Sequence, residues 1–137
     1  MRSLLLLFIA IAVCTLPGCK KDKPVTPSGL FGKWELTRRF GGNILPADTV
    51  FKPGNGNILQ LNSDSTYKRY TNGQLSGTGN YHVRSRSIYQ MTQLPGSEIF
   101  FDNDYSFVSF ITISGNVLTL QPILGDIAST QYQKIQN

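Results

Sequence analysis

Residues 31–40 read FGKWELTRRF, and the alternation within this stretch predicts the fold class. In an extended chain, one face would carry Trp34, Leu36, Arg38 and Phe40. The opposite face would carry Lys33, Glu35, Thr37 and Arg39. Because side chains of a strand point alternately to its two faces, such a pattern is typical of a half-buried β-strand. The stretch therefore predicts a strand with one side toward a core.

The strongest turn signal in the chain is Asn72-Gly73, which suits a two-residue type I′ hairpin. It lies between two runs rich in β-branched and aromatic residues, at 66–71 and 75–83. A hairpin of this kind would pair Thr71 with Gln74, Tyr70 with Leu75, and Lys68 with Gly77. Gly77 and Gly79 would share a face of the second strand, where glycine often marks a bulge, a tight bend at a barrel corner, or the close approach of a ligand or backbone.

Similar short runs continue to the end of the chain, and no segment shows a helical period. Further strands are predicted at 58–61, 87–94, 99–101, 105–113, 117–121 and 130–135. The segment 41–57 is predicted to be a long connection. Eight or nine short strands joined mainly by tight turns indicate an antiparallel meander, which must close into a barrel or fold into a sandwich to protect its edges.

The N-terminus has the features of a secretory signal peptide. Arg2 is followed by an apolar run from Leu4 to Leu16. That run is shorter than the about 20 residues that span a bilayer, but it matches the length of a signal-peptide core. We therefore interpret residues 1–18 as a signal peptide.

Leu16-Pro17-Gly18-Cys19 resembles the lipobox of bacterial lipoproteins. The resemblance implies cleavage before Cys19 and a diacylglycerol on its thiol. Acyl chains such as palmitate would then hold the protein on a membrane, because two or three chains anchor firmly. The alternative is an ordinary signal peptide with an incidental cysteine. Lys20 replaces the aspartate that retains many lipoproteins in the inner membrane, so we expect the outer membrane, with either face possible.

Residues 19–29 hold lysines and prolines with little to bury, and we interpret them as a flexible tether before one domain at 30–137. Cys14 would leave with the signal peptide and Cys19 would be acylated, so the domain would contain no disulfide and no reactive thiol. The formal net charge of +5 includes Arg2 and a tether with three lysines and one aspartate, which leaves the domain near +2. This charge does not suggest a nucleic-acid partner.

Gly32-Lys33-Trp34 resembles the Gly-x-Trp motif of lipocalins, and residues 30–36 look like the opening of small bacterial lipocalin-like lipoproteins. The resemblance covers residues 30–137 and continues at 61–67, at Gly79-Asn80-Tyr81 and at 132–135. It implies an all-β fold, an antiparallel up-and-down barrel of about eight strands. It also implies that Trp34 packs across the closed end under a cation from the last strand, where Lys134 is the candidate.

Barrels of eight strands are either filled by side chains or hold one small ligand. We expect a small, largely apolar ligand, since tyrosine offers an apolar ring with a hydroxyl that orients a ligand. The candidate contacts are Tyr67, Tyr81, Tyr89, Phe107 and Phe110. The alternative is a filled barrel that binds another envelope protein through its outer face or the 41–57 connection. In both cases we expect a monomer.

Residues for catalysis or metal binding are sparse. His82 is the one histidine, and it alternates out of phase with its neighbours, which predicts an outward position and no Ser-His-Asp triad. Glu98, Asp102 and Asp104 form an acidic cluster, but their spacing matches no calcium loop. Gly54 to Asn57 lacks the lysine of a phosphate loop. We therefore expect no enzyme activity, no metal and no cofactor.

Overall fold

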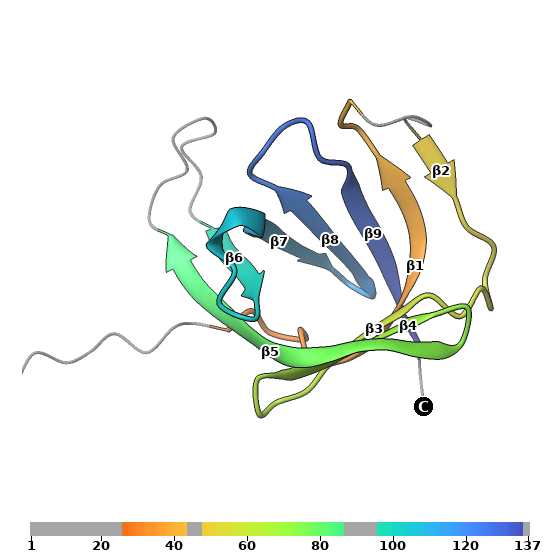
Figure 1. The fold of residues 1–137 in the computed structure, drawn as a ribbon, viewed down its shortest axis with the longest axis horizontal. Helices are drawn as coiled ribbons and strands as arrows, with labels where there is room; N and C mark the ends of the chain where they lie inside the picture. Colours follow the sequence, from red (N-terminus) through yellow and green to blue (C-terminus); the bar gives the residue numbers. More distant parts are fainter. Residues whose placement is uncertain (1–25, 44–47, 87–95, 136–137) are drawn as a thin grey trace, which may run out of the picture.

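The protein folds into a closed antiparallel β-barrel, seen in a computed structural model that describes residues 26–43, 48–86 and 96–135 (Figure 1). The described strands are β1 (Gly32–Phe40), β2 (Asp48–Val50), β3 (Ile58–Leu61), β4 (Thr66–Thr71), β5 (Gln74–Arg86), β6 (Gly96–Phe101), β7 (Ser109–Ser114), β8 (Val117–Pro122) and β9 (Ser129–Ile135). Their order is β2-β1-β3-β4-β5-β6-β7-β8-β9, and β1 also pairs with β9. Eight strands therefore form a ring and β2 is an extra strand, which confirms the predicted all-β barrel.

The hairpin between β4 and β5 forms at the predicted turn. Asn72 and Gly73 have φ values of 52° and 79°, so both adopt the positive φ that a type I′ turn requires. The predicted pairs Thr71–Gln74 and Tyr70–Leu75 are confirmed. The predicted pairing of Lys68 with Gly77 is wrong, because a bulge shifts the register and Lys68 pairs with Thr78.

A second bulge interrupts β1. Leu36 pairs with Tyr132 of β9, but the next pair is Arg38–Gln131, so Thr37 is an extra residue. An extra residue reverses the alternation of the side chains that follow it. The prediction that Arg38 shares the face of Trp34 is therefore wrong, and Arg39 lines the barrel interior in its place.

Two other segments differ from the predicted strands. The strand expected at 105–113 begins only at Ser109, because residues 105–107 form a short 3₁₀ helix, η2 (Tyr105–Phe107), whose N-terminus is capped by the side chain of Asp104. The connection 41–57 contains β2. The strand predicted at 87–94 lies outside the described residues.

The N-terminal segment closes one end of the barrel, which we call the closed end. Trp34 and Leu30 have no exposed surface, and Trp34 Nε1 donates to the carbonyl oxygen of Leu30 at 2.8 Å. Lys134 Nζ lies 4.9 Å from the centre of the Trp34 ring and donates to the carbonyl of Gly29 at 2.8 Å. This is the arrangement that the Gly-x-Trp resemblance implies, and it includes a cation–π contact.

Gly32 has a physical role in the same arrangement. Its φ is +135°, a conformation that other residues rarely adopt, and a Cβ there would lie 2.9 Å from Lys134 Cε. Glycine therefore leaves room for the lysine to cross over the ring of Trp34.

The apolar core occupies the barrel interior next to the closed end. The apolar cluster consists of Leu30, Trp34, Leu59, Leu61, Tyr67, Tyr81, Ile99, Ile111, Leu118 and Leu120. These side chains come from β1, β3, β4, β5, β6, β7 and β8, and from the segment before β1. Nearly every strand of the ring thus contributes to one continuous core.

Glu35 fixes the loop that connects β2 to β3. Its side chain is almost completely buried on the outer side of β1. The carboxylate accepts hydrogen bonds from the backbone N–H groups of Gly54 at 3.0 Å and Gly56 at 3.1 Å. Asn55 Nδ2 adds a bond to the carbonyl of Leu36 at 2.9 Å. The loop therefore covers the edge of β1 that lies between its pairings with β2 and β3.

We predict that Glu35→Ala lowers the free energy of unfolding by about 2 kcal/mol, because two backbone amides lose a charged acceptor. Urea denaturation followed by the fluorescence of Trp34, the single tryptophan, measures this change. Asp126→Ala is the control, since Asp126 is exposed. An equal effect of the two substitutions would contradict the role assigned to Glu35.

Candidate functional site

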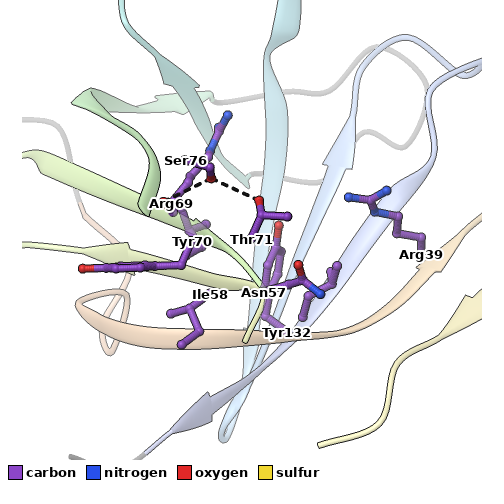
Figure 2. Close-up of a pocket in the computed structure, with 10 residues that line it drawn as sticks. Arg39, Asn57, Ile58, Arg69, Tyr70, Thr71, Ser76 and Tyr132 are labelled. Carbon is purple, nitrogen blue, oxygen red and sulfur yellow. Dashed lines mark hydrogen bonds between the residues drawn. The ribbon is translucent and has the colours of Figure 1, made fainter. Parts of the chain in front are cut away.

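We call the end of the barrel away from Trp34 the open end, and a small hollow lies there. Figure 2 shows the side chains that line it. Its volume is about 150 Å³. It is lined by Leu36, Arg39, Asn57, Ile58, Leu59, Arg69, Tyr70, Thr71, Ser76 and Tyr132. This volume is half of the about 300 Å³ at which ligand pockets usually begin, so a ligand here is small or only partly enclosed.

Arg69 of β4 is exposed and lies on the barrel side of the strand, beside two aromatic rings. Because Tyr67 and Arg69 are two residues apart on one strand, they share a face. The Arg69 guanidinium carbon lies 5.0 Å from the centre of the Tyr67 ring and 4.4 Å from that of Phe101. Cation–π contacts at these distances restrict the side chain to the barrel side of β4.

Arg39 reaches the hollow from the opposite wall because of the bulge in β1. Its guanidinium carbon lies 5.8 Å from the centre of the Phe51 ring. Figure 2 shows the guanidinium of Arg39 and the hydroxyl of Tyr132 directed toward the middle of the view, where Thr71 lies. Two cations from different strands thus line one small space.

Asp102 joins the β6–β7 connection to β4 and β5 next to Arg69. Its carboxylate accepts hydrogen bonds from the hydroxyl of Tyr67 at 2.6 Å and from the backbone N–H of Asn80 at 2.9 Å. The Tyr67 hydrogen bond, followed by that of Asn80, holds the pKa of Asp102 below its usual value. Burial, helped by the hydrogen bond to Asp102, raises the pKa of Tyr67.

Gly79 makes the approach of Asp102 possible. A Cβ at this position would lie 1.9 Å from Asp102 Oδ1, which no side chain permits. Glycine on this face of β5 was predicted to mark a bulge, a tight bend, or the close approach of a ligand or backbone, and the structure shows that a side-chain carboxylate approaches Gly79.

The predicted ligand contacts are not gathered around the hollow. Tyr67 and Tyr81 are buried in the core, and their hydroxyls are bonded to Asp102 and to the carbonyl of Asn62. Phe107 is 61% exposed on η2. Phe110 precedes the buried Ile111 on β7 and therefore faces the outside. Tyr89 lies outside the described residues.

The polar residues considered for catalysis and metal binding have structural contacts. His82 is exposed and stacks on Phe100 at 5.2 Å between ring centres. Glu98 is fully buried and forms an ion pair with Arg84 at 2.6 Å. Asp104 caps η2. Across residues 26–43, 48–86 and 96–135, no three His, Cys, Asp or Glu side chains converge as they would around a metal ion.

A larger depression, of about 340 Å³, lies at the closed end. It is lined by Phe31, Gly32, Lys33, Gln60, Leu61, Asn62 and Ser63. The buried core separates it from the barrel interior, and its lining includes only one charged side chain. The arginines make the open-end hollow the more specific candidate site.

Sequence reasoning missed both arginines. The spacing of Arg69 from Tyr67 on a predicted strand was a usable signal, because residues two apart share a face. Arg39 had no such signal, since only the bulge at Thr37 turns it inward. The bulge depends on the pairing of β1 with β9, which is about a hundred residues away in the chain.

Comparison of the chain with models of protein families, with curated proteins and with solved structures gave no match. The described part of the chain also contains no helix of the length and hydropathy that a membrane span requires. The candidate site is therefore inferred from its geometry.

We predict that Asp102→Asn destabilises the barrel at pH 7 and that this difference shrinks as the pH falls below about 4. A carboxyl whose pKa is lowered by folding stabilises the fold above its unfolded pKa, and the contribution is lost as the pH falls through the folded value. Urea midpoints of both proteins at pH 7 and pH 3 measure the effect. Asp126→Asn is the control. A difference in urea midpoint between the wild-type and Asp102→Asn proteins that stays constant with pH would contradict the prediction.

Proposed function

We propose that this chain is a lipoprotein of the cell envelope, held on the outer membrane by acyl chains on Cys19, with a lipocalin-like barrel that binds a small, largely apolar ligand. The ligand would enter the open end of the barrel. The observation that carries the proposal is the unequal filling of the interior, which is solid around Trp34 and hollow beside Arg69.

The lining of the hollow supports a ligand that is partly apolar. Leu36 and Leu59 line it and are almost fully buried, while Tyr132 adds a ring and a hydroxyl. Polar groups at Asn57 and Thr71 lie around them. Ligand sites commonly combine an apolar lining with a few polar groups that fix orientation.

The anchor is supported by the N-terminal sequence and by the place where the domain begins. Leu16-Pro17-Gly18-Cys19 has the pattern of a lipobox, and residues 19–29 provide a polar spacer. The spacer leads to the closed end through Leu30. A tether attached there leaves the open-end hollow clear of the chain's own anchor.

Replacement of the lipidated cysteine tests the anchor. We predict that the Cys19→Ala protein accumulates unprocessed and carries no acyl chain, whereas the wild-type protein is processed and enters detergent extracts of outer membranes. Metabolic labelling with palmitate and mass spectrometry of the N-terminal peptide measure both properties. A wild-type protein that is processed without acylation would contradict the anchor.

Release of bound molecules tests ligand binding. The mature protein, purified from membranes and then denatured, should yield a small molecule by mass spectrometry. Thr71→Trp, which places a large ring in the hollow, should remove it, and Lys68→Trp on the outer face of the same strand should not. Absence of any molecule above the blank, together with no binding of added amphiphiles, would reject the proposal.

A second candidate function is an interaction protein that binds an envelope partner through the loops at the open end. Large apolar side chains are exposed at the end of β2, in η2 and between β8 and β9: Val50, Tyr105, Phe107 and Leu124, with exposed fractions of 77%, 62%, 61% and 52%. Exposed apolar groups often mark contact surfaces when they are grouped. Crosslinking in intact cells would recover one reproducible partner, and Thr71→Trp would leave that crosslink unchanged.

A further inference from the structure

The hollow at the open end is positively charged without a neutralising acid in its lining. Arg39 and Arg69 both line it, and no aspartate or glutamate does. Among the described residues, neither guanidinium has a carboxylate within salt-bridge distance, whereas neighbouring Arg38 is paired with Asp48. Two like charges around one small space raise its positive potential, which favours an incoming anion.

Arg69 is held in position before any ligand arrives. The rings of Tyr67 and Phe101 contact its guanidinium, and Tyr67 is itself fixed by its hydrogen bond to Asp102. A guanidinium carries five N–H donors in a planar fork that matches a carboxylate or a phosphate. Within the described part of the chain, none of these donors makes a hydrogen bond, so the fork is oriented and available.

Asp102 attracts this cation electrostatically, but no ion pair joins the two side chains. Each of its carboxylate oxygens already accepts a hydrogen bond, one from Tyr67 and one from Asn80. The hydroxyls of Thr71 and Ser76 are also engaged, since Thr71 donates to Ser76 at 3.1 Å and Ser76 donates to the carbonyl of Arg69 at 3.2 Å (Figure 2). The cationic donors of the hollow therefore belong to its two arginines, and the hydroxyl of Tyr132 lies beside them.

We infer that the end of the ligand that enters the hollow is a monoanionic head group, a carboxylate or a phosphate diester, received by Arg69 together with Arg39. The inference rests on the proposed ligand-binding function and names the class of ligand, an anionic amphiphile. A volume of about 150 Å³ accommodates such a head group with a short part of its chain, which would lie against Leu36 and Leu59.

A matched pair of amphiphiles tests the inference. The mature lipoprotein in phosphatidylcholine nanodiscs is titrated with octanoate and with 1-octanol by isothermal titration calorimetry, and empty discs correct for partition into lipid. Octanoate should bind at least about tenfold more tightly than 1-octanol, because hydrogen bonds to a charged group exceed those to a neutral one. A second titration, in discs that contain phosphatidylglycerol, identifies the source of the head group. If the site takes a lipid head group, phosphatidylglycerol competes with octanoate and lowers its apparent affinity. If the site takes a free acid, the affinity for octanoate is unchanged.

Methionine variants distinguish binding inside the hollow from attraction of the anion by the general surface charge. Arg69→Met keeps an apolar stem over the rings and should lower the affinity for octanoate at least about tenfold, with no change in the affinity for 1-octanol. Arg39→Met should lower the affinity for octanoate by a smaller factor. The controls are Lys68→Met, on the outer face of the same strand, and Arg38→Met, beside Arg39 in β1, and both should retain the wild-type affinity.

The outcomes distinguish the inference from the function on which it rests. Equal binding of octanoate and 1-octanol, unchanged in Arg69→Met, would overturn the anionic head group and leave ligand binding intact. Equal weakening by Lys68→Met and Arg69→Met would also overturn it, because net charge would then explain the binding. Failure of both amphiphiles to bind would reject the proposed function itself.

Discussion

The pairing of β1 with β9 is the constraint on which the rest of the molecule depends. It runs from Lys33–Ile135 at the closed end to Phe40–Ser129 at the open end and turns a meander into a ring. The eight strands of the ring leave no free edge among themselves along which other chains can add, and the extra strand β2 is only three residues long. It also defines an interior, so that Trp34, Leu118 and Ile99 pack against one another although they are far apart in the sequence.

The two edges of β1 are occupied in different ways. One edge is paired with β9, and the other is shared between β3 and β2, with the loop before β3 filling the interval. Glu35 holds that loop through backbone amides. The bulge at Thr37 lies where these pairings change, and it turns Arg39 into the barrel. The candidate site is therefore a consequence of how β1 is shared among its neighbours.

The two ends of the barrel are built from different chemistry. At the closed end, Trp34 has its indole N–H bonded and its ring covered by Lys134. At the open end, Arg69 lies over aromatic rings without an ion pair among the described residues. A buried polar group is stable only when it is paired, whereas an exposed cation such as Arg69 can stay unpaired until an anion binds. This difference is why the proposed function is placed at the open end.

The sequence by itself determined the local features of this protein. Alternation around Trp34 and the Asn72-Gly73 turn predicted strands and a hairpin, because both depend on backbone preferences within a few residues. The positions of Arg39 and Asp102 were decided only by the tertiary structure. A bulge or a close approach at glycine depends on which distant strand lies alongside, and the sequence carries no local signal of that partner. The fold class was thus predictable, while the residues that line the candidate site depended on pairings across the closed barrel.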